Sequence, residues 1–298
     1  MDNRAEVREF LTTRRERVTP ERVGLPEGSN RRVKGLRRSE VAALAGVSVE
    51  YYTRIERGAI GGASPEVLDA IARALLLDHA EQAYLLDLAH AAGPVGRAVR
   101  TRRPRPSSLH RTLQWTLDSV TGSAAIVRNG RMDMLAANSV GRAFYRDAYD
   151  MPGTTPNFAR FIFLDQRGVD FHLDWERAAD TAVQILRAEG ARNPYDKEHH
   201  ELIGELSCRS VEFRRRWAAH NVTRHGTGVK YFRHPVVGDL TVAFESLELA
   251  SEPGLTLTLY TPEPGSPSEE RMRLLASWAA SEDAGAGRHD SEAEATNA

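Results

Sequence analysis

The sequence predicts two domains of different class: an all-α domain of five helices, then an α+β domain built on an antiparallel sheet. Apolar residues recur at helical spacing through residues 1–92. The stretch 93–108 is rich in proline, glycine and arginine and is typical of a linker. Within 109–278, alternating apolar residues predict strands on both sides of a helical block. Residues 279–298 have a polar, small-residue composition without periodicity, which predicts disorder.

The first helix is expected over residues 3–17, where Val7, Phe10 and Leu11 recur on one face. A connector with turn residues and basic side chains follows at 19–35. Later helices are predicted after Ser64, which precedes a proline at the first helical position, and after a second capping residue, Asp78.

Two short helices joined by a tight turn are predicted at residues 39–58. Gly46 permits a left-handed turn, and Ser48 stands where its oxygen can cap the second helix. On that second helix Tyr52 and Ile55 recur on an inner face, which leaves the opposite side open to an outside partner. Such a pair of helices is typical of a helix-turn-helix reader of DNA.

The residues of this segment resemble the phage-repressor-like regulators, called the XRE family, over residues 1–90. The resemblance rests on Glu40, Ala42, Gly46, Val47, Ser48, Ile55, Glu56 and Gly58. It implies that the second helix contacts base edges through Val49, Glu50, Tyr51 and Arg54. A guanidinium such as that of Arg54 can bond both acceptors of a guanine edge. Glu50 either accepts a hydrogen bond from cytosine or pairs with Arg54 one turn away.

Phosphate contacts are expected from Arg37 and Arg38, at the head of the first helix of the pair. The XRE family usually carries Ser or Thr and then Gln there, so the arginines weaken the cap and add charge. Arg31, Arg32 and Lys34 in the preceding loop either contact phosphates as well or form a solvated loop.

Charge is distributed unevenly between the two halves of the chain. The net charge is −1, yet residues 1–107 hold 19 Lys or Arg and 14 Asp or Glu, a net of +5. The remaining residues have a net charge of −6, from 21 Lys or Arg and 27 Asp or Glu. Positive charge therefore concentrates beside the predicted reader, where phosphates would lie, and the acidic half is expected to stay off DNA.

The second domain opens with a hairpin at 123–138, where Asn129-Gly130 is a strong two-residue turn signal. Pairing across that turn places Val127 opposite Met132 and Ala125 opposite Met134. Helical periodicity follows, and strands return at 229–233, 240–248 and 255–260. The layout predicts an antiparallel sheet with helices inserted between its second and third strands.

A narrower resemblance covers nearly the whole chain. It rests on the segments GLRRSEVAALAGVS, YYTRIERG, HPVVGDLTVAFESLEL and LYTPEPGSPS, which are similar to the MmyB-like subgroup of regulators. The resemblance implies a PAS-like second domain with a cavity for a small apolar ligand such as a fatty acid. Aromatic candidates for the cavity wall are Phe144, Phe161, Phe213 and Trp217, each of which could equally be a core residue.

Other functional classes find little support in the sequence. The motifs GxSxG, GK[ST] and HExxH are absent, the histidines lack ligand spacing, and no cofactor-binding motif is found, so neither an enzyme nor a metal site is predicted. The one cysteine, Cys208, excludes an internal disulfide and fits a reducing compartment. Without a signal peptide or an apolar run of about 18 residues, the chain is expected in the cytoplasm, away from membranes.

Together these observations predict a transcriptional regulator, with repression favoured over activation. Because one reading helix covers few base pairs, a homodimer on a palindromic, double-stranded operator is expected. Two alternatives remain: the second domain serves only dimerisation or protein-partner binding, or the reader regulates an enzyme.

Overall fold

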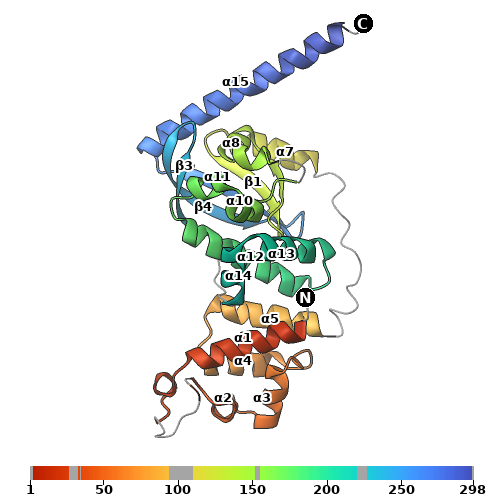
Figure 1. The fold of residues 1–298 in the computed structure, drawn as a ribbon, viewed down its shortest axis with the longest axis vertical. Helices are drawn as coiled ribbons and strands as arrows, with labels where there is room; N and C mark the ends of the chain where they lie inside the picture. The colour runs from red at the N-terminus through yellow and green to blue at the C-terminus, as the bar shows by residue number, and fades with distance from the viewer. Residues whose placement is uncertain are drawn as a thin grey trace. The chain divides into compact units, whose positions relative to one another are not determined.

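The structure is a computed structural model that describes residues 3–26, 33, 35–93, 110–151, 155–219 and 227–296. The chain divides into two compact units (Figure 1). Unit 1 holds residues 1–104 and 183–224, and unit 2 holds residues 105–182 and 225–298. The predicted domains, with boundaries at 92 and 109, are each one continuous stretch of chain, whereas each compact unit combines two separate stretches.

The N-terminal part of unit 1 is helical, as predicted. Its elements are α1 (Asn3–Arg17), the 3-10 turn η1 (Pro20–Val23), α2 (Arg38–Leu44), α3 (Val49–Glu56), α4 (Pro65–Ala74) and α5 (His79–Ala92). Phe10, Tyr52 and Ile71 come from α1, α3 and α4 and are fully buried in one core. A shared core of this kind lets the short helices α2 and α3 bury their inner faces, which neither could do alone.

The turn between α2 and α3 has the predicted geometry. Gly46 adopts a φ of +67°, in the left-handed region that a side chain disfavours. Ser48 caps α3, because its hydroxyl accepts a hydrogen bond from the Tyr51 backbone N–H at 3.1 Å. At the other end of α3, Gly58 adopts a φ of +97° and lies against Arg4 of α1, which leaves no room for a β-carbon.

Three further helices carry the rest of the described part of unit 1: α12 (Trp175–Arg192) from Val183 onward, α13 (Lys197–Arg209) and α14 (Val211–Ala218). Ala191 of α12 is buried in the same core as Phe10. Unit 1 is therefore assembled from two stretches of chain that lie far apart in sequence.

Unit 2 is an α+β fold. Its strands are β1 (Ala124–Asn129), β2 (Met134–Ala137), β3 (Thr227–His234), β4 (Gly238–Glu248) and β5 (Leu255–Pro262), all paired antiparallel in the order β2-β1-β5-β4-β3. Its helices are α7 (Arg111–Asp118), α8 (Ser139–Phe144), α9 (Arg146–Tyr149), α10 (Phe158–Leu164), α11 (Gln166–Phe171), the first turns of α12, and α15 (Pro267–Thr296). Helices do follow the second strand and precede the third, as predicted.

The register predicted for the first hairpin is wrong. Val127 pairs with Ala136, and a bulge then places Arg128 opposite Met134. The loop is wider than a two-residue turn, because Met132 adopts a φ of +69° and the Asn129 side chain bonds Asp133 across it. This local hydrogen bonding outweighs the Asn-Gly signal.

In the structure, α15 continues as a helix to Thr296, and the disorder expected for residues 279–298 stays a prediction. Alanine and glutamate are frequent there, and both have high helix propensity. A segment with too few apolar residues to build a core can still extend a helix that starts in the folded domain, because adding residues to an existing helix requires no new nucleation.

Candidate DNA-binding surface

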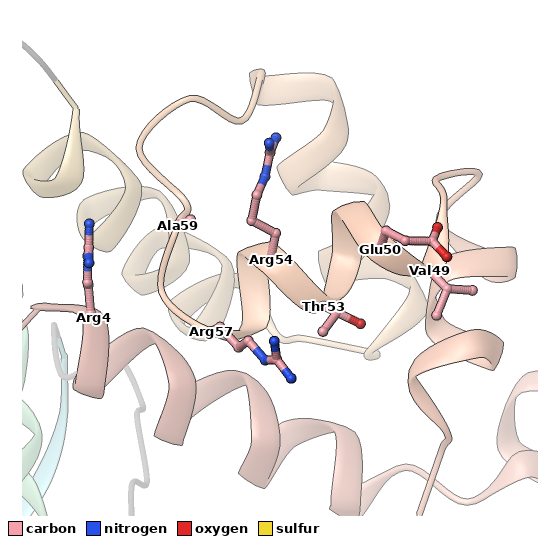
Figure 2. A pocket seen from close by; sticks show the side chains of 7 residues that line it. All are labelled: Arg4, Val49, Glu50, Thr53, Arg54, Arg57 and Ala59. Carbon is pink, nitrogen blue, oxygen red and sulfur yellow. The ribbon is translucent and has the colours of Figure 1, made fainter.

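The outer side of α3 borders an open groove of about 460 Å³ (Figure 2). Five of its lining residues come from α3 and its C-cap: Val49, Glu50, Thr53, Arg54 and Arg57. The other two are Arg4 of α1 and Ala59 of the loop that follows α3. Three guanidinium groups and one carboxylate thus surround a space open to solvent. Such a surface suits a ligand with closely spaced negative charges.

Three of the four predicted base-contact residues line this groove, namely Val49, Glu50 and Arg54. The fourth, Tyr51, is half-buried against the core. The Arg54 guanidinium lies over the Tyr51 ring, with its central carbon 5.0 Å from the ring centroid. Both roles considered for Glu50, contact with cytosine and pairing with Arg54, stay predictions. A guanidinium held over a ring loses less freedom when it binds a partner.

Thr53, Arg57 and Arg4 also line the groove and were not among the predicted contacts. Thr53 and Arg57 follow Val49 at steps of four residues, so helical spacing alone could have placed them on the same face. Arg4 belongs to another helix. Its position depends on the close packing of Gly58 against α1, which no local pattern reveals.

A buried carboxylate holds α3 to its neighbours. Glu56, at the end of α3, is fully buried between two arginines. Arg15 of α1 donates from Nε to Glu56 Oε1 at 2.6 Å, and Arg38 of α2 bonds Glu56 Oε2. Burial beside this carboxylate raises the pKa of the Tyr52 hydroxyl, which stays protonated. One charge network therefore joins α3 to α1 and α2.

Arg38 was predicted to contact phosphate, and the structure pairs it with Glu56 while 46% of its side chain remains exposed. Arg37 precedes it at the N-cap of α2, where Glu40 accepts a hydrogen bond from the Arg37 backbone N–H at 2.6 Å. An arginine side chain has no acceptor to complete a reciprocal capping box, which agrees with the weaker cap expected here. Arg31, Arg32 and Lys34 lie outside the described residues.

The chain entering α2 is closely fitted to α1. Arg15 donates to the Leu36 carbonyl at 2.9 Å, and the Leu36 N–H donates to the Arg15 carbonyl at 3.0 Å. A β-carbon on Gly35 would lie 2.3 Å from that same Arg15 carbonyl oxygen. These contacts fix where α2 begins, and with it the position of Arg37 and Arg38.

The four residues proposed for a ligand cavity fall into two groups. Phe144 and Phe161 lie in unit 2, both fully buried in a cluster of aromatic rings with Tyr145 and Phe171. Phe213 and Trp217 lie in unit 1, where their rings stack with centroids 5.3 Å apart. The four residues therefore belong to two different units, and their role in a cavity wall stays a prediction.

Residues 109–275 match the family described as MmyB-like transcription regulator ligand binding domain. Residues 6–85 match a helix-turn-helix domain family. The chain belongs to the MmyB-like transcription regulators. It is accordingly a DNA-binding transcription regulator with a ligand-binding domain, and both families are typical of regulators without enzymatic activity. Comparison with curated proteins gives no match.

In this MmyB-like regulator, the aromatic cluster of the matched ligand-binding domain contains polar groups that sequence reasoning missed. His172 is buried, with Nδ1 2.7 Å from the Gly168 carbonyl oxygen, and burial lowers its pKa to about 4. His234 lies 3.1 Å from the Ala143 carbonyl oxygen, and burial lowers its pKa as well. No pattern of apolar neighbours in the sequence distinguishes these two buried histidines from surface histidines.

Two further findings bear on what the MmyB-like regulator can bind. Across the described part of the chain, no group of three or more His, Cys, Asp or Glu is arranged to hold a metal ion. In the same residues, no helix has both the length and the apolar character needed to cross a bilayer.

Proposed function

We propose that this regulator is a sequence-specific repressor that places α3 in the major groove of its operator. The observation that carries the proposal is the solvent-open groove along α3, which combines a base-reading candidate, Arg54, with flanking arginines at positions 4 and 57. The matched helix-turn-helix family supports the same docking mode. Repression follows if a bound dimer occupies sequence that the transcription machinery needs.

Base reading is assigned to Val49, Glu50, Tyr51 and Arg54. In this proposal Arg54 bonds both acceptors of a guanine, a contact worth about 1–3 kcal/mol of discrimination. The Tyr51 ring lies against the Arg54 guanidinium and so supports it. The Val49 methyl groups suit contact with a thymine methyl.

Phosphate contacts are assigned to two groups of basic residues. Arg37 and Arg38 at the start of α2, together with Arg31, Arg32 and Lys34, form one group, and Arg57 and Arg4 form the other. Such contacts fix the register of the reading helix without adding sequence preference.

The regulator is proposed to act in the cytoplasm as a homodimer on a palindromic operator, with half-sites about 34 Å apart. Its PAS-like second domain is proposed to bind a small apolar ligand such as a fatty acid. The ligand acts by preferring one of two arrangements of the paired readers, because only a difference in affinity can shift their populations.

Selection of bound fragments from a random DNA library tests the DNA-binding part of the proposal. Arg54→Ala is expected to lose preference at one base pair of each half-site, whereas Arg73→Ala, an exposed arginine of α4 that does not line the groove, retains it. An Arg54→Ala protein with the wild-type motif contradicts the assignment of α3 as the reader.

Mass spectrometry of an organic extract from the denatured protein tests the sensor part. A fatty acid at near-stoichiometric amount supports it. A specific observation favours the alternative of a dimerisation or partner-binding domain: Phe144 and Phe161 are closely surrounded by other rings. An empty extract, together with operator binding that no fatty acid alters, favours that alternative.

A further inference from the structure

Arg187 of α12 is among the largest fully buried side chains of the described residues, with 1% of its surface exposed. A guanidinium keeps its charge at any pH that a folded protein tolerates, so burying one is costly without charged and polar partners. Arg187 lies in unit 1. Its partners identify the surface against which this part of α12 is held.

Those partners come from the helix-turn-helix domain and from α14. Arg187 Nη1 forms an ion pair with Oε1 of Glu6, a residue of α1 that is itself buried. The Tyr84 hydroxyl of α5 donates to the same Glu6 oxygen at 2.5 Å. Arg187 Nη2 donates to the Trp217 carbonyl oxygen, and the guanidinium carbon lies 4.4 Å from the centroid of the Trp217 ring. The charge is therefore compensated on both sides.

Further contacts surround this ion pair. Ala191 lies one turn along α12 and is buried in the core that holds Phe10 and Tyr84, whose rings meet edge to face at 5.0 Å. At the rim, Arg192 bonds Asp87 of α5 at 3.1 Å, and Arg17 of α1 donates to the Ala219 carbonyl at 3.2 Å. An apolar contact and polar contacts thus enclose a buried charge pair, as in an interface with an anchor and a rim.

We infer that residues 183–219 form a docking surface whose partner is the helix-turn-helix domain of the same chain, and that the Arg187–Glu6 ion pair is its anchor. The two family matches identify the parts of the chain that this contact connects. Glu6 lies in the segment matched as helix-turn-helix, and Arg187 lies in the segment matched as ligand-binding domain. The docking surface therefore joins the two matched parts at a buried charge.

The Arg187–Glu6 ion pair is connected to α3 through one helix, α1. α1 carries Glu6, which binds Arg187, and it also carries Arg15, which binds Glu56 of α3. A change in how firmly α1 is held is therefore a change in the support of the reading helix. This step rests on the proposed function, because it assigns the docking surface the task of setting how the reader is presented to DNA. Spatial connection alone is not coupling, so coupling must be measured.

The first experiment measures backbone hydrogen exchange in the full chain, which requires no DNA. Arg187→Met and Glu6→Gln are each expected to raise exchange in α1 and α5 at least about tenfold, because each leaves a buried charge without its partner. The double variant is expected to exchange no faster than the worse single variant, since the two residues act as a pair. Additive effects, or unchanged exchange in α1 and α5, overturn the inference.

Two matched variants keep this test decisive. Arg187→Lys retains the charge, loses the two-sided hydrogen bonding and gives an intermediate effect even if Arg187→Met fails to fold. Arg192→Ala removes a rim pair on the same helix, and its effect is expected to stay below about twofold because exposed pairs contribute little. A rim variant as disruptive as Arg187→Lys also overturns the assignment of the anchor.

The second experiment tests the functional consequence by measuring operator affinity while the distance between half-sites is changed by one or two base pairs. The wild-type protein is expected to prefer one spacing, and Arg187→Lys is expected to bind several spacings within about threefold of one another, because a loosely held reader can adjust. Equal spacing preference in both proteins contradicts the regulatory role. If the protein binds no operator at all, the proposed function fails, and hydrogen exchange still decides whether the docking surface exists.

Discussion

At the residue scale, the position of α3 depends on side chains that are buried inside unit 1. Glu56 accepts hydrogen bonds from Arg15 and Arg38 and is fully buried, so it aligns α3 without reaching the groove. Glu56 is one of the residues on which the resemblance to the XRE family rests, but its structural role was not predicted. Nothing in the spacing of charged residues indicates that Arg15, 41 residues away, is the partner of this carboxylate.

Removing this carboxylate tests its role. Glu56→Ala leaves the Arg15 guanidinium buried without a counter-charge, and we expect the free energy of unfolding of unit 1 to fall by about 3–5 kcal/mol. Denaturant unfolding followed by the circular dichroism of the helices measures it. Glu50→Ala, an exposed change on the same helix, is the control and should cost no more than about 0.5 kcal/mol. Equal losses for the two variants would contradict a structural role for Glu56.

Arg57 lines the groove but stands beyond the predicted base contacts. If it binds a phosphate, Arg57→Ala should weaken all DNA sequences alike and reduce the slope of log affinity against log salt by about 1. Titrations of cognate and random DNA at several salt concentrations measure this slope. A wild-type slope in the variant, or a loss confined to the cognate operator, argues against a phosphate contact.

At the scale of elements, the short helices owe their positions to turns that only certain residues allow. Ser48 caps α3 and Gly46 makes the left-handed turn before it, and both follow from short-range chemistry. Gly58 ends the same helix at a positive φ, where it also touches α1. The end of α3 is thus set jointly by backbone conformation and by a neighbouring helix.

Gly58→Ala tests this close approach. An alanine there adopts an unfavourable φ, and its β-carbon meets the Arg4 backbone at 2.7 Å, so we expect a loss of at least about 1–2 kcal/mol in thermal or denaturant unfolding. Gly62→Ala is a matched control, because nothing lies within 4 Å of the added carbon. A Gly58→Ala protein as stable as the Gly62→Ala protein would show that α1 and the end of α3 are not in close contact.

At the scale of the whole molecule, the two units present different electrostatic problems. Unit 1 buries charges in pairs, as at Glu6 and Arg187, whereas the aromatic cluster of unit 2 buries histidines in their neutral form. Charged histidine is disfavoured there because the surrounding rings solvate it poorly. The stability of unit 2 should therefore depend on pH.

The direction follows from the lowered pKa of His172. Its pKa is about 4 in the folded protein and 6.5 when exposed, so between these values the unfolded chain binds more protons. Stability should be complete above pH 6.5 and fall as pH is lowered toward 4, by up to about 3 kcal/mol. His172→Gln keeps a donor for the Gly168 carbonyl and should flatten this dependence. Unfolding measured from pH 7 to pH 4.5 with the same steepness in both proteins would exclude His172 as the cause.

The sequence by itself determined the parts whose physics is local. Helical periodicity, the Ser48 cap, the Gly46 turn and the strand β5 all depend on residues a few positions apart, and the structure contains each of them. It also placed Val49, Glu50 and Arg54 on one open face, since residues at these spacings share a side of a helix.

Only the tertiary structure decided which buried faces meet. Arg187 and Glu6 are 181 positions apart, and Phe213 and Trp217 belong to a different unit from Phe144 and Phe161. Periodicity identifies a face that must be buried, but the hydrophobic effect is non-directional and does not name the surface that covers it. The register of the first hairpin shows the same limit, because side-chain hydrogen bonds in its loop overrode the turn signal.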